Sequence, residues 1–181
     1  MALVVAISGS PSAPSRTSQL NDWVADSLAA QGFEVARINV RDLPPADVLH
    51  ARLDSPALRE PLGLVERAQG VVVATPVYKA SFTGVLKAFL DLLPQLGLTG
   101  KVVLPLATGG TLAHVLAIDY GLRPVLSALG AQHVVSGLFI LDKLLAQSVG
   151  GALAIEADAE ARLRAVVGDF VASLRRHQVT G

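Results

Sequence analysis

Hydroxyl side chains gather around one arginine in the segment SGSPSAPSRTSQL (8–20), directly after a short apolar run. Its candidate anion-binding side chains are those of Ser10, Ser15, Arg16, Thr17 and Ser18. A helix that begins here presents unpaired N–H groups and the positive end of its dipole, so it binds phosphate readily. The segment therefore predicts an anion site, and the alternative is an ordinary serine-rich turn in which Ser15 caps the helix.

Two better-known nucleotide loops are absent from the sequence. There is no GxxxxGK[ST], which excludes a P-loop ATPase, and no GxGxxG, which is the usual dinucleotide fingerprint. No Ser/His/Asp set, carboxylate pair or metal-ligand cluster stands out either, so we expect no metal and no catalytic triad.

A second polar segment, TPVYKASFTG (75–84), follows another apolar run. Tyr78 places a flat aromatic ring beside the cation of Lys79, and this pair suits the border of a planar, electron-accepting ligand. The alternative is a tyrosine that packs on its own loop.

A third segment, ATGGTLAH (107–114), is rich in small and hydroxyl residues. Glycines permit close backbone approach, and threonines donate hydrogen bonds. We expect His114 to be a surface or capping group rather than a catalyst. The residues of interest are Thr108, Gly109, Gly110 and Thr111.

These segments need a scaffold, and the apolar runs predict one. The runs lie at 3–8, 33–40, 70–77, 101–109 and 132–141. Three of the five are almost continuous Val, Ile and Leu, which is typical of parallel strands buried on both faces. The run 33–40 alternates more and suits an edge strand.

Helical patterns separate the strands. The spacing of Phe82, Leu86 and Phe89 predicts a helix over 82–96, and a second is expected near 153–176. Alternating strands and helices predict an α/β fold, a flavodoxin-like three-layer sandwich with a five-stranded parallel sheet in the order 2-1-3-4-5. Ligands of such sheets bind beyond the carboxyl ends of the strands. The stretch 41–56 is expected to be a long loop.

Composition narrows the class of protein. The 181 residues are 51% hydrophobic, carry no formal net charge and include no cysteine. Thiol chemistry and disulfides are thus excluded, and no basic footprint of a nucleic-acid binder exists. Without a basic leader or a long uncharged apolar run, we expect a soluble cytoplasmic protein with one domain over 1–181 and no membrane contact.

The stretch AIDYGLRPVLSALG (117–130) reads as a helix that contains Gly121 and Pro124. Proline lacks an N–H and clashes with the carbonyl four residues back, which belongs to Tyr120. A π-bulge would absorb this disruption, and such bulges are frequent at functional sites. A simple proline kink is the alternative.

Together, three stretches closely resemble the NADPH-dependent FMN reductases of the flavodoxin-like superfamily. They are GSPSAPSRTSQL (9–20), TPVYKASFTGVLKAFLDLLP (75–94) and KVVLPLATGGTLAHVLAIDYGLRPVLSAL (101–129), and HARLDSPAL (50–58) also fits. The nearest match is the reductase component of two-component alkanesulfonate monooxygenase systems. The resemblance covers most of residues 1–135. One departure is Ser12, where many relatives have a basic residue.

The resemblance implies a role for each matching residue. The FMN phosphate would be held by Ser10, Pro11, Ser15, Arg16, Thr17 and Ser18. The isoalloxazine would be lined by Pro76, Val77, Tyr78 and Lys79, and its polar edge by Thr108, Gly109, Gly110 and Thr111. Tyr120 matches a family tyrosine in a π-helical insertion at a subunit interface, which implies control of flavin exchange.

The resemblance also implies the activity. NADPH would reduce FMN by direct hydride transfer, and reduced FMN would pass to a flavin-dependent monooxygenase that attacks an organosulfur compound. The protein would be a homo-oligomer, a dimer or tetramer. The alternatives are an FMN-retaining quinone or azo reductase, a flavodoxin-like electron carrier, and a non-flavin phosphosugar or nucleotide binder.

Overall fold

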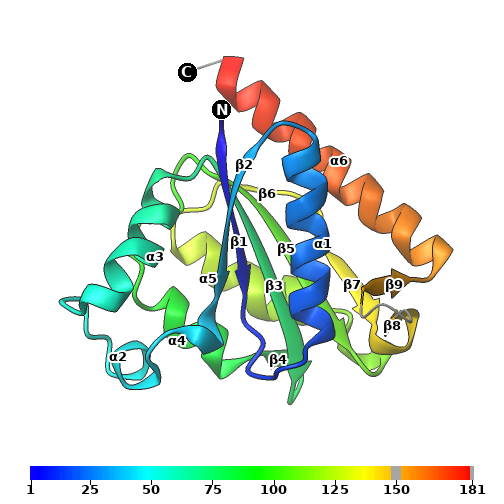
Figure 1. The fold of residues 1–181 in the computed structure, drawn as a ribbon, viewed down its shortest axis with the longest axis horizontal. Helices are drawn as coiled ribbons and strands as arrows, with labels where there is room; N and C mark the ends of the chain where they lie inside the picture. Colours follow the sequence, from blue (N-terminus) through cyan, green and yellow to red (C-terminus); the bar gives the residue numbers. More distant parts are fainter. Residues whose placement is uncertain (148–151, 180–181) are drawn as a thin grey trace.

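The computed structural model describes residues 1–147 and 152–179, in which one sheet lies between two layers of helices (Figure 1). The strands of the main sheet are β1 (Leu3–Ser8), β2 (Glu34–Asn39), β3 (Gly70–Tyr78), β5 (Val102–Gly109), β6 (His133–Val134) and β7 (Leu138–Leu141). Their order is β2-β1-β3-β5-β6, with β7 also paired to β5, and all these pairs are parallel.

The predicted flavodoxin-like order is confirmed, with its fifth strand split into β6 and β7. The break lies opposite Pro105 of β5, because Val134 pairs with Val103 and Leu138 with Leu106. Pro105 has no N–H to donate to a neighbouring strand. Gly137 lies so close to it that a Cβ there would approach the Pro105 carbonyl oxygen to 2.8 Å.

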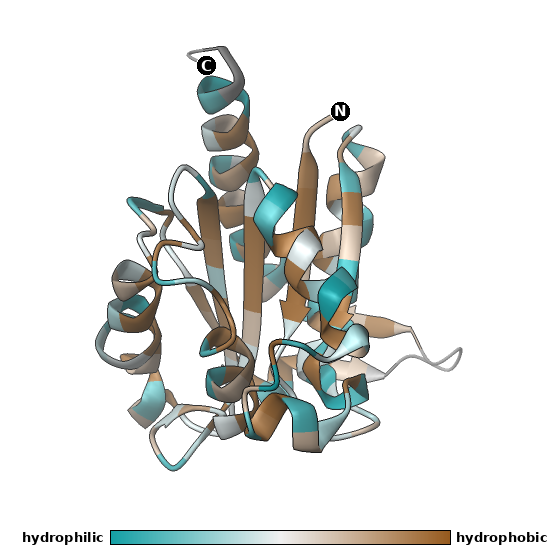
Figure 2. Cartoon of the chain, turned by 90° about the vertical axis from the view of Figure 1, so that its left-hand side faces the viewer, coloured by the Kyte–Doolittle hydropathy of each residue, from teal (hydrophilic) through white to brown (hydrophobic). Residues whose placement is uncertain are grey.

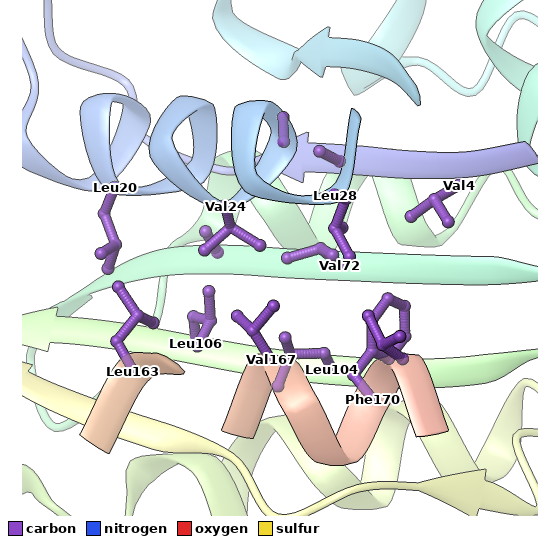
Figure 3. Close-up of a cluster of buried hydrophobic side chains, with 14 of the residues drawn as sticks. Val4, Leu20, Val24, Leu28, Val72, Leu104, Leu106, Leu163, Val167 and Phe170 are labelled. Atoms are coloured by element: carbon purple, nitrogen blue, oxygen red, sulfur yellow. The ribbon is translucent and has the colours of Figure 1, made fainter. Parts of the chain in front are cut away.

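Both faces of the sheet are buried, as the apolar runs predicted. Helices α1 (Arg16–Ala30) and α6 (Ala157–Val179) cover one face. Figure 3 shows Leu20 of α1 and Leu163 of α6 pointing toward one another over the strands, with Phe170 farther along. Helices α3 (Pro56–Arg67), α4 (Gly84–Leu90) and α5 (Arg123–Ala128) cover the other face. In Figure 2 the central strands are hydrophobic over most of their length, whereas the helices carry both hydrophobic and hydrophilic residues.

The helix expected over 82–96 is shorter in the structure. α4 ends at Leu90, because Pro94 lacks the N–H that would bond to the Leu90 carbonyl. Its first two expected residues instead form β4 (Ser81–Phe82), which pairs antiparallel with the end of β3.

Two further boundaries differ from expectation. The stretch 41–56 contains the end of a 3-10 turn, η1 (Val40–Asp42), and a short helix, α2 (Pro45–Leu49). The final helix begins at Ala157, because Leu153–Ile155 forms β9, which pairs antiparallel with β8 (Leu145–Gln147). The structure has a further 3-10 turn, η4 (Asp142–Leu144), directly after β7.

The predicted π-bulge is confirmed. Ile118–Leu122 forms one π-helical turn, η3, and the Arg123 N–H bonds to the Ile118 carbonyl, five residues back. Regular α-helix resumes as α5 at Arg123, with Pro124 in its first turn, where a missing N–H is tolerated. The proline thus sits at the junction between the two helical forms.

None of the helices in the described part of the chain is both long and apolar enough to cross a membrane.

The C-terminal helix supplies a test of the single-domain prediction. Phe170 is fully buried between α6 and the sheet, and Arg164 lies over the Trp23 ring of α1, 4.9 Å from its centroid. We expect Phe170→Ala to lower the free energy of unfolding by about 3–5 kcal/mol, because the cavity it leaves cannot close fully. Urea unfolding followed by Trp23 fluorescence and by circular dichroism measures it.

The exposed Arg162 on the same helix is the matched control, and Arg162→Ala should change stability by less than about 0.5 kcal/mol. Two separate transitions, with the Trp23 transition unmoved by Phe170→Ala, would contradict one cooperative domain.

Candidate functional site

A cavity of ≈ 420 Å³ opens at the carboxyl ends of the central strands. It is lined by Ser10, Ser12, Pro14, Ser15, Arg16, Thr17, Pro76, Tyr78, Thr108 and Asp142. These residues follow or end β1, β3, β5 and β7, so four separate strands deliver them to one place. This is where ligands of open parallel sheets bind.

The start of α1 forms one wall. Ser15 has an extended backbone and its hydroxyl accepts a hydrogen bond from the Ser18 N–H at 3.1 Å, which fixes the first turn. Arg16 is the first helical residue and is exposed, and within residues 1–147 and 152–179 no hydrogen bond or ion pair engages it. A free guanidinium thus lies beside a helix N-terminus, and this arrangement attracts an anion.

Buried hydrogen bonds hold the loop before α1 in place. The hydroxyls of Thr17 and Thr108 are 2.7 Å apart, which joins α1 to the end of β5. The Thr83 hydroxyl donates to the Gly9 carbonyl at 2.6 Å and also caps α4 by accepting from the Leu86 N–H. A Cβ at Gly9 would come within 2.5 Å of the Leu86 Cβ, so only glycine permits this approach.

The opposite wall is the end of β3 and its hairpin with β4. Tyr78 pairs with Ser81 across a two-residue turn and is itself 49% exposed. Both turn residues, Lys79 and Ala80, have positive φ, at 51° and 65°. Left-handed backbone costs non-glycine residues about 1–2 kcal/mol each, and strain of this kind clusters at ligand sites. Tyr78 therefore lies directly before a strained turn, which fixes its position at the edge of the cavity.

The cavity brings together half of the fourteen cofactor residues expected from the sequence. These are Ser10, Ser15, Arg16, Thr17, Pro76, Tyr78 and Thr108.

The other seven lie around it without lining it. Ser18 is buried and its hydroxyl meets that of Ser8 at 2.9 Å, Val77 packs on Phe139, and Gly109 lies so close to Phe139 that a Cβ would clash with the ring. Thr111 caps a 3-10 turn, η2 (Leu112–His114), Lys79 is in the hairpin turn, and Gly110 and Pro11 are exposed.

Sequence reasoning missed Asp142 and Pro14 and left Ser12 outside its set of site residues. Asp142 directly follows the last strand, so its place at a strand's carboxyl end was a usable signal. It adds a carboxylate to a cavity whose other charged wall is Arg16. Arg41, whose guanidinium donates to the Ser12 carbonyl oxygen, was also missed.

A second cavity of ≈ 420 Å³ lies beside the π-turn. It is lined by Ala80, Ser81, Ala113, His114, Leu116, Ala117, Tyr120 and Gly121. Tyr120 is 79% exposed at its rim, and the apolar side chains of Leu112 and Leu116 are exposed nearby in the chain. His114 belongs to this second cavity and does not line the first.

The first cavity fits FMN by the chemistry of its walls. Hydroxyls, a free guanidinium and a helix N-terminus suit a phosphate, and Pro76 with the half-exposed Tyr78 suits a flat ring. Among the described residues, no group of three or more His, Asp or Glu could hold a metal ion.

Comparison with known proteins agrees with this chemistry. Residues 2–145 match the family described as NADPH-dependent FMN reductase. An FMN reductase (NADPH) of Pseudomonas putida is 52% identical over 148 residues, which cover 82% of this chain and 75% of the relative. The FMN reductase (NADPH) of Escherichia coli is 52% identical over 139 residues, 77% of this chain and 73% of the relative.

A solved structure is also similar along almost the whole chain. It is an NADH:FMN oxidoreductase (EMOB) in its apo form, with a TM-score of 0.88 and 44% identity, covering 96% of this chain and 90% of its own.

The fold and the first cavity define a flavodoxin-like oxidoreductase that uses FMN and a nicotinamide nucleotide. More specifically, the chain belongs to the NADPH-dependent FMN reductase family.

The hydrogen bond between Thr83 and Gly9 should affect both the stability of the protein and the binding of FMN in the cavity. We expect Thr83→Val to lower the free energy of unfolding by about 1–3 kcal/mol, since it leaves a buried carbonyl and a helix N–H without partners. It should also weaken FMN binding, because the loop from Gly9 onward loses its anchor. Urea unfolding and flavin fluorescence titration measure the two effects.

The exposed Thr99 offers a control, and Thr99→Val should alter neither quantity. If Thr83→Val destabilised the protein yet bound FMN as tightly as the parent, the anchor would have no bearing on the cavity.

Proposed function

We propose that the protein reduces exchangeable FMN with NADPH and supplies the reduced flavin to a separate flavin-dependent monooxygenase that acts on an organosulfur compound. The observation that carries the proposal is the first cavity, in which the unengaged Arg16 at a helix N-terminus faces the same space as the aromatic edge of Tyr78. The partner and its substrate rest on the resemblance of the segments quoted above.

The wall residues bind and orient rather than react. FMN, when bound, supplies the hydride chemistry, which needs alignment of the two rings more than an acid or a base. Ser10, Thr17 and Thr108 are almost fully buried, so their hydroxyls are fixed in position before any ligand arrives. Pro76 and Tyr78 then fix where the ring lies, while the exposed side of Tyr78 leaves room for a nicotinamide.

The charge of the cavity supports exchange of FMN rather than permanent retention. Of the described residues that line it, Arg16 alone is cationic, and Asp142 adds an opposing carboxylate. A phosphate monoester carries roughly two negative charges at neutral pH. The lining charges therefore leave most of that charge uncompensated.

We also propose that the face around the π-turn joins copies of this chain into a homo-oligomer. Tyr120, Leu112 and Leu116 are exposed there, and exposed apolar groups that cluster are typical of protein contacts. Light scattering after size exclusion measures the mass, and a monomer at micromolar concentration would contradict this part of the proposal.

Steady-state oxidation of NADPH with and without added FMN tests the function, and the same assay with NADH tests the preference for the nicotinamide nucleotide. A colourless preparation that oxidises NADPH only with added FMN supports the proposal. A yellow preparation that reduces quinones supports the retained-flavin alternative, and absence of any NADPH oxidation leaves an electron carrier or, without flavin affinity, a binding protein.

Arg16→Ala should weaken FMN binding by about 1.5–3 kcal/mol, the range for a hydrogen bond to a charged group. Riboflavin, which lacks the phosphate, should bind both proteins alike. Flavin fluorescence titration gives the constants, with the exposed Arg162→Ala as the matched control. An unchanged FMN dissociation constant would remove Arg16 from the site.

Tyr120→Ala should change flavin retention and turnover without changing the fold, because the side chain is exposed and makes no buried contact to lose. Stopped-flow measurement of flavin release and steady-state turnover test this. If both stay at the parent values while the oligomer also persists, Tyr120 governs neither exchange nor assembly.

A further inference from the structure

Arg41 reaches the loop between β1 and α1 from the turn that follows β2. It is part of η1, directly after β2, and its guanidinium Nη1 donates to the Ser12 carbonyl oxygen and lies 3.4 Å from the Ser18 hydroxyl. Ser12 lines the first cavity and Ser18 is in the first turn of α1. One side chain thus touches the middle of the loop that precedes α1 and the first turn of α1 itself.

The ion pair that Arg41 forms is with an exposed carboxylate, which competes only weakly with the loop for its charge. The Arg41 side chain is 23% exposed, and its nearest carboxylate is that of Asp42, 3.5 Å from Nε and largely open to solvent. Burial raises the pKa of the Asp22 carboxyl, and the charges of Arg37 and Arg41 oppose that rise. Asp22 and Asp26 pair with Arg37. Both acids of α1 thus form their ion pairs with Arg37, and Arg41 adds a weaker attraction to Asp22.

The cavity has a charge deficit that Arg41 can reduce. Arg16 is the one cation among its described lining residues, whereas the phosphate of FMN carries roughly two negative charges. Arg41 does not line the cavity but lies behind the loop that does. It would therefore act on a bound phosphate indirectly, by holding the loop in place and by the electrostatic attraction of its charge. A charge in a partly buried position is screened less than one in open water.

We propose that Arg41 is the second cation of the FMN phosphate site and that it positions the loop from Ser10 to Ser15 by holding the Ser12 carbonyl. This rests on the proposed FMN chemistry of the first cavity. The residue that compensates the phosphate thus comes from the end of β2, about thirty positions after the loop it serves, while position 12 within the loop is an uncharged serine. Arg41 is a positioning residue and takes no part in hydride transfer.

The test compares FMN with riboflavin, which differ by the phosphate alone. Arg41→Gln should raise the FMN dissociation constant about tenfold or more, the effect of losing a charged partner, and should raise that of riboflavin less than about threefold. The parent protein should also lose FMN affinity more steeply with added salt than Arg41→Gln does. Flavin fluorescence titration provides all the constants.

A charge returned to the loop itself should rescue the variant. Ser12→Arg in the Arg41→Gln background should restore FMN affinity about tenfold, a clearly larger gain than the same change gives in the parent. Such non-additivity is the signature of two groups that perform one task. Arg37→Gln is the matched control, since Arg37 lies in β2 just before the turn that holds Arg41 and pairs with Asp22 and Asp26. It should leave the binding of both flavins unaffected.

Three outcomes would overturn the proposal. They are an Arg41→Gln protein that binds FMN like the parent, one that loses riboflavin as severely as FMN, and a double variant without rescue. Should Arg41→Gln not fold, Arg41→Lys takes its place, and a tenfold loss of FMN affinity despite the retained charge would count against the proposal. If the parent itself neither binds nor reduces FMN, the proposed function fails, which is a result distinct from any of these.

Discussion

The hydrogen bond from the Thr83 hydroxyl to the Gly9 carbonyl joins two loops that are far apart in sequence. It forms because Gly9 has no Cβ and can approach Leu86 at the start of α4. Since the same hydroxyl caps α4, one side chain anchors both the loop before α1 and the start of α4. The bond from Thr17 to Thr108 then fixes the far side of the loop to β5. These two hydrogen bonds together fix the position of the loop that forms one wall of the cavity.

Much of this arrangement could be predicted from the sequence, because its signals lie within short stretches of the chain. Continuous Val and Ile runs define buried parallel strands, and the order of a sheet places its loops. Pro124 marked the place of the disruption, because its missing N–H affects an identifiable carbonyl, while the family resemblance favoured a π-turn over a simple kink. Half of the expected cofactor residues line the cavity, while the ligand roles of all of them stay predictions.

What the sequence did not reveal depends on contacts between distant residues. Arg41 lies after an edge strand and has no motif, so its contact with Ser12 is visible only once β2 lies beside β1. Asp142 enters the cavity because the last strand is broken opposite Pro105 and resumes along β5. The end of α4 at Leu90 could have been predicted from Pro94, which interrupts the helical hydrogen bonds. The prediction of a longer helix instead followed the apolar spacing of Phe82, Leu86, Phe89 and Leu93, which continues past that point.

The hairpin turn at Lys79 and Ala80 has a wider consequence. Its far strand lies against the π-turn, where a Cβ on Gly121 would be 3.2 Å from the Ser81 hydroxyl oxygen and 3.6 Å from the Phe82 ring. Ser81 in turn pairs with Tyr78. The aromatic wall of the first cavity and the exposed rim that holds Tyr120 are therefore joined by one short hairpin. A molecule bound at that rim would lie against the same hairpin whose first residue, Tyr78, lines the first cavity.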